Sequence, residues 1–436
     1  MRNYKEFFNG KKVTMLGLGL LGRGLNDAKF LAECGAILTI TDLKTKEQLE
    51  PTIKKLAKYK NIKYVLGEHR LEDFRDCDFV LKAAGVPLDS IYIEEAKKNK
   101  IPVEMDESLF AKCAPNVKVV GITGTRGKTT TTYLIYEILK LAFPKKVHLG
   151  GNIKGLATLP LLKKVKEGDI VVMELSSWQL QGWGEAKICP NISVFTNLMD
   201  DHLNYYKGSV KKYFEDKAKI YTNQNKSDYL ICGEKIFKQI GKVKSKKIIS
   251  KKNDVPKGWK IKIKGDHNLE NISYAIKIAE ILGVPEKTIK KAVENFGGVE
   301  GRQEFLREYK GVKIYNDTTA TTPDATIAAL NSFGSNKNIV LIMGGADKNL
   351  DMGGLIKEIP KYCKKVILLA GTGTEKLGGK VDGILAKSLK EGLLEALKWV
   401  KKGDILILSP GFASFGMFKN EFDRGKQFVR LVKALK

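Results

Sequence analysis

Hydrophobic positions along the chain follow two alternating patterns, short apolar runs and longer segments with apolar residues at helical spacing. The chain begins with the run KKVTMLGLG, continues with the helical segment LLGRGLNDAKFLAECGA, and returns to the β-branched run ILTITD. A short apolar run bounded by turn residues is typical of a strand, and apolar spacing of about three to four residues is typical of a helix. The pattern predicts a strand, a glycine turn, a helix and a second strand.

The same pattern starts afresh after Pro115, in the segment CAPNVKVVGITGTRGKTTTTYLIYEILKLA. Two further buried strands are predicted at DIVVMELSS and ISVFTNL, and a strong amphipathic helix at HNLENISYAIKIAEILG. After ENFGGVEGRQ a third series follows, with strands at VKIYND, NIVLIMGG, KKVILLAG and DILILSPG, each followed by a helical segment. Strands that alternate with helices indicate parallel sheets covered on both faces.

Composition restricts the class of protein. With 43% hydrophobic and 29% charged residues, the chain can bury a sizeable core as a soluble globular protein. No apolar stretch approaches the roughly 20 residues of a membrane helix, and the first residues lack a signal-peptide pattern. The 6 cysteines lie far apart with no CxxC pair, which favours reduced thiols in a cytoplasm.

The net charge of +27 raises the hypothesis of a nucleic-acid-binding or nucleotide-gated regulatory protein. The lysines are spread along the whole chain, however, and no basic segment alternates with stacking aromatic residues. We therefore expect a lysine-rich solvated surface with no nucleic-acid and no membrane partner. A positive cleft would still attract polyanionic small molecules.

Two glycine motifs follow predicted strands. Residues 17–22, GLGLLG, open a helix, and Asp42 ends the next strand. This is the dinucleotide fingerprint, but a lone GxGxxG is weak, so we favour another phosphate-bearing nucleotide over a nicotinamide cofactor. Residues 121–130, GITGTRGKTT, are more specific, although they miss the strict P-loop spacing by one residue. Their glycines let backbone N–H groups face phosphates, Lys128 adds a positive charge, and Thr129 can hold Mg²⁺.

The segment TGTRGKTT resembles the phosphate loop of the Mur ligases and of their relative folylpolyglutamate synthase. The resemblance covers essentially the whole chain in the right order. Matching segments are GN at 151–152, ELSSWQL at 174–180, N and DH at 197 and 201–202, KAKI at 217–220, GDHNLEN at 265–271, Arg302, ND at 316–317, and SP through FKN at 409–420. The tail and the short first domain are most similar to those of members that add D-glutamate to UDP-N-acetylmuramoyl-L-alanine.

This resemblance implies three α/β domains. Residues 1–110 would be a Rossmann-like domain that binds the UDP-sugar, and residues 111–297 a central P-loop ATPase-type domain with a mostly parallel sheet that binds ATP and Mg²⁺. Residues 298–436 would be a Rossmann-like domain that binds the incoming amino acid. The length of 436 residues suits three domains.

The implied activity is ATP-dependent amide-bond formation in peptidoglycan synthesis, and so in cell-wall biogenesis, cell shape and cell division. UDP-N-acetylmuramoyl-L-alanine, glutamate and ATP would be the substrates of a cytoplasmic monomer. Forming an amide from a carboxylate requires activation, which γ-phosphoryl transfer supplies as an acyl phosphate. Three alternatives stay open: the same reaction with L-glutamate, a ligase like folylpolyglutamate synthase, and, remotely, an NAD-dependent oxidoreductase.

The resemblance also implies the site residues. Catalysis is expected from Lys128, Glu174, His202 and Lys217. Two Mg²⁺ ions would be held by Thr129, Glu174, His202 and a carbamylated Lys217. ATP would be bound by Gly124, Thr125, Arg126, Gly127, Lys128, Thr129, Thr130, Asn268, Asn271, Arg302 and Asp317. The UDP-sugar would be bound by Gly19, Leu20, Leu21, Asp42, Gly85, Asn152, Ser176 and Gln179. The amino acid would be bound by Thr321, Lys348, Ser414 and Phe415.

Several of these residues have a plainer interpretation. Sequence alone places Lys217 on an exposed helix turn, as a solvated lysine. Asn268 and Asn271, three apart, could cap a helix instead of binding nucleotide. A glutamate at a strand end, such as Glu174, could be a surface carboxylate, and His202 could be structural.

Four positions depart from the family pattern. Leu21 lies in the first loop at a position where a hydroxyl residue is frequent. Gly301 stands where the family has a histidine before the arginine, and Thr319 replaces a lysine near the phosphates. Glu421 directly follows Asn420, where an aromatic residue is usual. The last departure concerns the amino-acid pocket and therefore the identity of the substrate.

Overall fold

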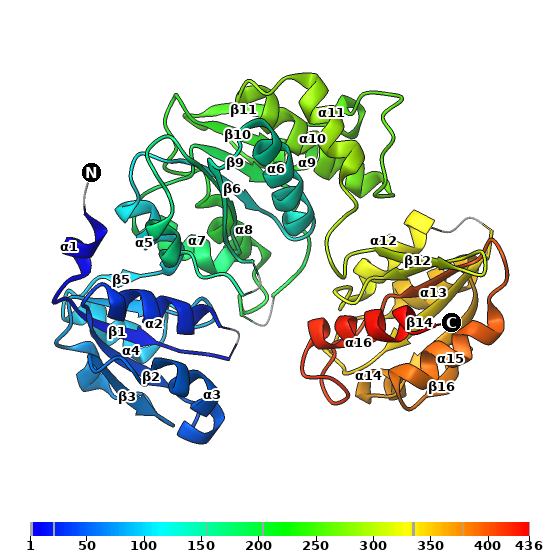
Figure 1. The fold of residues 1–436 in the computed structure, drawn as a ribbon, viewed down its shortest axis with the longest axis horizontal. Coiled ribbons are helices and arrows are strands. Elements are labelled where there is room, and N and C mark those ends of the chain that lie inside the picture. The colour runs from blue at the N-terminus through cyan, green and yellow to red at the C-terminus, as the bar shows by residue number, and fades with distance from the viewer. Residues whose placement is uncertain are drawn as a thin grey trace. The chain divides into compact units, whose positions relative to one another are not determined.

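The computed structural model describes residues 3–20, 22–153, 155–202, 205–333, 336–377 and 379–435. Within these ranges the chain forms three sheets flanked by helices (Figure 1). Met1–Val255 and Glu270–Ala292 form one compact unit with the first two sheets, and Pro256–Leu269 and Val293–Lys436 form another with the third. No helix in the described ranges combines the length and apolar character needed to cross a membrane.

The first sheet is parallel, in the order β3-β2-β1-β4-β5. Its strands are β1(Lys12–Leu16), β2(Ile37–Asp42), β3(Ile62–Leu66), β4(Phe79–Lys82) and β5(Val103–Glu104). Its helices are α1(Tyr4–Phe8), α2(Arg23–Glu33), α3(Lys46–Leu56), η1(Leu71–Phe74), α4(Ile91–Lys98) and α5(Asp106–Cys113). The predicted strand–turn–helix–strand start is confirmed. Because β1 lies between β2 and β4, the loops after β1 and β4 open at a topological switch point.

The second sheet is also parallel, in the order β11-β10-β9-β6-β8-β7. Its strands are β6(Lys118–Thr123), β7(Val147–Gly151), β8(Ile170–Glu174), β9(Ile192–Phe195), β10(Tyr229–Cys232) and β11(Lys246–Ile249). The helices of this part are α6(Lys128–Ala142), η2(Leu159–Lys163), α7(Ser177–Glu185), α8(Val210–Ala218), α9(Glu234–Gln239), η3(Lys252–Asp254), α10(Asp266–Ile281) and α11(Glu286–Asn295). Here β6 lies between β8 and β9, so the second glycine loop also opens at a switch point.

The third sheet has the order β12-β13-β17-β14-β15-β16. Its strands are β12(Glu304–Tyr309), β13(Val312–Asn316), β14(Ile339–Gly344), β15(Cys363–Leu369), β16(Ile384–Ala386) and β17(Ile405–Leu408). Its helices are α12(Pro323–Phe333), α13(Gly353–Tyr362), α14(Thr372–Lys376), α15(Leu389–Trp399) and α16(Glu421–Lys433).

One strand of this sheet departs from the expected strand–helix alternation. The edge strand β12 is antiparallel to β13 and leads into it directly. Lys310 and Gly311 form the connection with φ values of 51° and 77°. Positive φ at both positions suits a tight two-residue hairpin turn. The rest of the sheet is parallel, as expected.

The apolar runs of the sequence become strands that are buried on both faces. In β14 all residues are buried, and successive side chains enter different cores. Val340 and Ile342 pack in a cluster that includes Leu393 of α15. Leu341 and Met343 pack in the opposite cluster, under α13. In the other unit, one continuous core joins side chains of the first and second sheets, so these two sheets are packed as a single body.

Candidate active site

The glycine loop of the second sheet, residues 124–127, is shaped by close packing. Gly124 has φ 141°, and an added Cβ would lie 1.9 Å from Thr196 Oγ1. At Gly127, with φ 82°, it would lie 2.4 Å from Asn271 Oδ1. Glycine is therefore required at both positions, and bare backbone remains where phosphate groups can approach.

Two lysines converge on this loop. Lys128 begins α6, and its Nζ donates to the backbone oxygens of Gly124 and Thr125, both at 2.9 Å. Lys217, in the last turn of α8, donates from Nζ to the same Gly124 oxygen at 2.7 Å. Its side chain packs on the Tyr213 ring, 4.5 Å from Nζ to the centroid, and the residue is 1% exposed. The interpretation of Lys217 as a solvated surface lysine is wrong.

Burial changes the chemistry of the Lys217 amine. Desolvation holds the pKa of Lys217 well below its usual range, and the neighbouring charge of Lys128 lowers the pKa further. Asp201 and Glu174 act in the opposite direction and are outweighed. The neutral amine is therefore strongly favoured compared with an ordinary lysine, which makes Lys217 a candidate nucleophile.

Glu174 ends β8 beside the glycine loop and is 4% exposed. Its Oε1 accepts a hydrogen bond from Asn152 Nδ2 at 3.4 Å. Its Oε2 is buried without a hydrogen-bond partner. A buried carboxylate oxygen that lacks a partner is costly, and a bound cation would satisfy it. The surface-carboxylate interpretation of Glu174 is wrong.

The loop after β9 brings Asp201 and His202 to the same edge. Arg126 Nη1 donates to Asp201 Oδ2 at 3.0 Å. Burial raises the pKa of Asp201, but the Arg126 charge and His202 outweigh this effect and hold it below the usual value. Burial lowers the pKa of His202, and the charges of Lys128 and Lys217 contribute. A neutral imidazole is the form that ligates metal ions.

The other residues expected at ATP in this unit lie around the loop. Thr129 and Thr130 are in the first turn of α6, and Thr125 is buried, with its hydroxyl 3.2 Å from the Met199 oxygen. Asn271 accepts a hydrogen bond from Thr131 Oγ1 at 3.1 Å. Since Asn271 lies inside α10 and not at its start, the capping interpretation is wrong for this residue.

Three of the residues expected at ATP belong to the other compact unit. Asn268, near the start of α10, donates from Nδ2 to the Lys264 oxygen at 2.7 Å. Asp317 directly follows β13, where its Oδ2 accepts from Ser409 Oγ at 2.8 Å. Burial raises the pKa of Asp317 to about 7, against the lowering effect of Ser409. Arg302 lies in the turn before β12 and also lowers that pKa.

The residues expected to bind the amino acid come together in the third sheet's unit. Lys348 Nζ donates to Thr321 Oγ1 at 3.1 Å. The backbones of Ala346 and Ala413 form a β-bridge, which brings the Lys348 loop beside the loop of Ser414. Ser414 is 3% exposed, whereas Phe415 is 66% exposed. Lys348 and Thr321 together present a cation and a hydroxyl group, which suits a carboxylate ligand.

Two departures from the family pattern contact each other. Thr319 Oγ1 donates to the Gly301 oxygen at 2.9 Å. An added Cβ at Gly301, where φ is 72°, would lie 2.9 Å from Thr318 Cγ2. The two departures, Gly301 and Thr319, therefore lie in contact at one place in the fold.

In the first sheet, Asp42 has a structural role in the glycine turn. Its Oδ2 accepts from the backbone N–H groups of Leu18 and Gly19, both at 2.9 Å. Burial raises the pKa of Asp42, but these backbone hydrogen bonds outweigh it and lower the pKa. Leu20 is exposed at the rim, and Leu21 lies outside the described residues.

Gly85 lies in the loop after β4, which a buried lysine braces. Lys82 is 3% exposed, and its Nζ donates to the Val86 oxygen at 2.7 Å. Burial lowers the pKa of Lys82 to about 8. Sequence reasoning passed over this residue because a lysine in an apolar run carries no motif.

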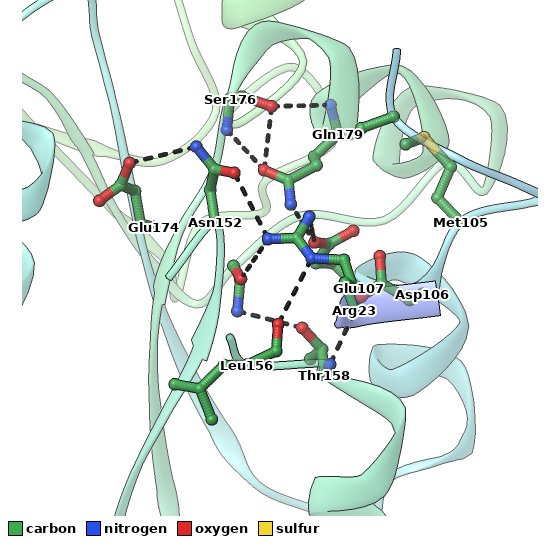
Figure 2. A network of polar contacts seen from close by, with 12 residues as sticks. Arg23, Met105, Asp106, Glu107, Asn152, Leu156, Thr158, Glu174, Ser176 and Gln179 are labelled. Atoms are coloured by element: carbon green, nitrogen blue, oxygen red, sulfur yellow. Dashed lines mark hydrogen bonds and ion pairs between the residues drawn. The ribbon is translucent and has the colours of Figure 1, made fainter. Parts of the chain in front are cut away.

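Asn152, Ser176 and Gln179 belong to a polar network that the sequence analysis missed (Figure 2). At its centre lie Arg23, at the start of α2, and Glu107, in the first turn of α5, with 3.3 Å between Arg23 Nη1 and Glu107 Oε1. The signal that could have revealed the pair was an arginine directly after the glycine motif and the acidic pair Asp106-Glu107 shortly before the pattern restarts.

Comparisons with known proteins agree with this geometry. The family model "Mur ligase middle domain" matches residues 122–254, and "Mur ligase, glutamate ligase domain" matches residues 301–412. A UDP-N-acetylmuramoylalanine–D-glutamate ligase of Roseiflexus sp. (strain RS-1) is 35% identical over 98% of this chain and 99% of its own length. One of Clostridioides difficile (strain 630) is 34% identical over 98% and 99%.

Solved structures share the fold. The UDP-N-acetylmuramate-alanine ligase of Thermotoga maritima has a TM-score of 0.59 at 20% identity, covering 98% of this chain and 100% of its own. A MurF ligase of Thermotoga maritima in complex with ADP has a TM-score of 0.61 at 18% identity, covering 98% and 95%. These comparisons make the oxidoreductase interpretation wrong. The chain belongs to the Mur ligase family and is an ATP-dependent amide-bond-forming ligase.

Proposed function

We propose that this ligase joins D-glutamate to UDP-N-acetylmuramoyl-L-alanine at the expense of ATP, as a step of peptidoglycan precursor synthesis. The names of its full-length relatives support this substrate pair. The observation that carries the chemistry is the convergence of Lys128, Lys217 and Glu174 at one glycine loop. One carboxylate oxygen of Glu174, Oε2, has no hydrogen-bond partner. We further propose a cytoplasmic monomer that acts on small molecules, with no nucleic-acid or membrane partner.

The three sheets would divide the substrates among them. Residues 1–110 would bind the UDP-sugar through Gly19, Leu20, Leu21, Asp42 and Gly85. Residues 111–297 would bind ATP, with Asn152, Ser176 and Gln179 reaching the sugar. Residues 298–436 would hold glutamate through Thr321, Lys348, Ser414 and Phe415, and would add Arg302 and Asp317 to the nucleotide site.

The reaction would proceed in two steps. The substrate carboxylate attacks the γ-phosphorus of ATP, so that ADP leaves and an acyl phosphate forms. The glutamate amine then attacks the acyl carbon, the C–N bond forms, and phosphate leaves with loss of a proton. The glycine loop and Lys128 contribute by orienting the phosphates and by balancing the charge that develops on them.

A pair of Mg²⁺ ions fits the residues at this edge. The free Glu174 Oε2, the neutral His202 imidazole and the Thr129 hydroxyl are oxygen and nitrogen donors of the right kind. Mg²⁺ held by these residues would supply positive charge that neutralises the phosphate groups. Within the described residues no three histidine, cysteine or acidic side chains already converge as a metal site, and a further oxygen donor would complete the set.

Carbamylation of Lys217 would supply that donor. Carbon dioxide reacts with a neutral amine, forming an N–C bond and releasing a proton, and the product is an anionic carbamate with two oxygens. The lowered pKa of Lys217 favours the neutral amine. The carbamate would place a negative charge beside the Lys128 ammonium, and these opposite charges attract each other.

The test is phosphate release from ATP in the presence of Mg²⁺. Phosphate should appear only when UDP-N-acetylmuramoyl-L-alanine and D-glutamate are both present. Equal turnover with L-glutamate would contradict the stereochemical assignment, and no turnover with the UDP-sugar would contradict the proposed function. A mass increase of the UDP-sugar equal to one glutamate residue identifies the product.

A further inference from the structure

The guanidinium of Arg23 reaches from the first sheet's part of the molecule into the second (Figure 2). Arg23 begins α2, directly after the glycine turn. Its Nη2 lies 3.0 Å from the Gly151 oxygen and 3.4 Å from Asn152 Oδ1, and its Nε lies 3.4 Å from the Leu156 oxygen. Arg23 thus donates to the last residue of β7 and to two residues of the loop that follows it.

Glu107, the ion-pair partner of Arg23, also contacts the start of α7. Glu107 Oε1 pairs with Arg23 Nη1 and also accepts a hydrogen bond from Gln179 Nε2. The other end of the Gln179 amide accepts from the N–H and the hydroxyl of Ser176, both at 2.9 Å. The Arg23–Glu107 pair therefore connects the end of β7 and the loop after it to the start of α7, which closely follows Glu174 in the chain.

Asn152 connects this ion pair to Glu174. Its backbone N–H donates to the Glu174 backbone oxygen at 2.7 Å. Its side-chain Nδ2 lies 3.4 Å from Glu174 Oε1, while its Oδ1 faces Arg23. A guanidinium can only donate hydrogen bonds. Arg23 therefore fixes which end of the Asn152 amide faces it, and the other end must present N–H to the carboxylate.

The charge balance explains why Arg23 is held in place. Glu107 is fully buried and Asp27 is 3% exposed, and Asp106 is a third acidic side chain nearby. Burial holds the pKa of Glu107 well above its usual range, Asp106 raises it further, and Arg23 opposes both effects without outweighing them. The Arg23 side chain is 26% exposed and that of Glu107 is fully buried, so loss of Arg23 would leave the Glu107 carboxyl without its cationic partner.

We propose that Arg23 is a positioning residue for Glu174. It fixes the orientation of the Asn152 amide so that Nδ2 donates a hydrogen bond to Glu174 Oε1. The other oxygen, Oε2, then remains for a divalent cation. The inference rests on the proposed function, because it takes Glu174 as a cation ligand. It adds a residue of the UDP-sugar-binding part to the set that determines cation affinity.

The test is the affinity of the full-length protein for Mn²⁺ at saturating ADP, measured from the EPR signal of free Mn²⁺. Arg23→Met removes the donor while keeping bulk, and should weaken Mn²⁺ binding about tenfold, since partners behind a metal ligand typically carry that much. If Arg23→Met does not fold, Arg23→Lys can replace it. Lysine keeps the charge but lacks the planar set of guanidinium donors, so Mn²⁺ binding should again be weaker.

A matched control distinguishes the positioning of Glu174 from a general effect of losing a contact between the first-sheet and second-sheet parts. Lys163 of η2 forms an ion pair with Glu33 of α2, and so also joins them, away from Asn152 and Glu174. Lys163→Met should leave Mn²⁺ affinity within about twofold, because it removes a joining contact and no orienting one. Equal losses in Lys163→Met and Arg23→Met would overturn the proposal.

A double-mutant cycle tests the route through Asn152. In an Asn152→Ala background the Arg23→Met substitution should cause no further loss, because the oriented amide is already gone. Full additivity, or unchanged affinity in Arg23→Met itself, would contradict the proposal. Glu174→Gln serves as the reference. If it fails to weaken Mn²⁺ binding, the proposed metal role is wrong and the inference falls with it. If it does weaken binding while Arg23→Met does not, only the inference is wrong.

Discussion

Lys128 and Lys217 donate to the same backbone oxygen, that of Gly124, at 2.9 and 2.7 Å. One lysine comes from the phosphate loop and the other from α8, far along the chain. Two ammonium groups on one acceptor repel each other in a buried site, which agrees with the depressed pKa of Lys217. The arrangement is stabilised when one of the two amines loses its positive charge.

Lys217→Ala should lower ligase activity by about 100-fold, because it removes a proposed metal ligand. Acetate or propionate should restore part of the rate by supplying carboxylate oxygens in the space left behind. ADP should still bind, because Lys128 is intact. Lys212→Ala, on the exposed side of the same helix, is the control and should be fully active. Phosphate release with and without the short acids measures the effect, and a fully active Lys217→Ala enzyme would contradict carbamylation.

Asp317 should make stability depend on pH. Its pKa is raised to about 7 by burial, whereas the unfolded chain ionises near the usual value of about 4. Between about pH 4 and 7 the unfolded state releases this proton while the folded state keeps it. This contribution to the free energy of unfolding therefore falls as pH rises through that window, by at most about 4 kcal/mol, and is constant above it.

Asp317→Asn should remove that dependence, since an amide does not ionise. Urea unfolding at pH 5, 6, 7 and 8 should show the free energy of unfolding of the wild type falling relative to that of the variant up to about pH 7. If the difference in the free energy of unfolding between the two proteins is constant across this range, the pKa of Asp317 in the folded state is not raised.

Arg424 is fully buried and supports the loop of the amino-acid cluster. Its Nη2 donates to the Thr318 backbone oxygen at 2.8 Å and its Nε to Thr318 Oγ1 at 3.1 Å. Arg424→Met removes the donor to the Thr318 backbone oxygen and should destabilise the protein by about 2 to 3 kcal/mol. We also expect a higher KM for glutamate, because Thr318 precedes the Thr321 loop. Arg430→Met, exposed on the same helix, should change stability by less than about 0.5 kcal/mol in thermal unfolding.

Gly301→Ala should destabilise the turn where the family pattern is lost. It combines a positive φ of 72° with a contact of 2.9 Å to Thr318 Cγ2, and we expect a cost of about 2 to 3 kcal/mol. Gly403→Ala is the control, because φ is 91° there and no atom lies within 4 Å of the added Cβ. It should cost about 1 kcal/mol from φ alone. Equal costs for the two variants in chemical unfolding would show that the turn has room for a side chain.

The strand and helix pattern was largely predictable because parallel sheets bury both faces of each strand. This burial requires the continuous apolar runs that are seen in β6, β8 and β14. The antiparallel β12 was not predicted, because its alternating exposure leaves a weak apolar signal. The Lys310-Gly311 turn was its clearest mark in the sequence.

The sequence by itself determined the chemistry of the phosphate loop and the family, because these depend on residue types at fixed local spacing. Only the tertiary structure decided that Lys217 is buried beside Lys128, and that Asp42 binds its own glycine turn. It also decided that Arg23 orients the amide of Asn152 across two parts of the molecule. Burial, charge pairing and amide orientation depend on atoms contributed by distant segments, and no periodicity along the chain records which of those segments will meet.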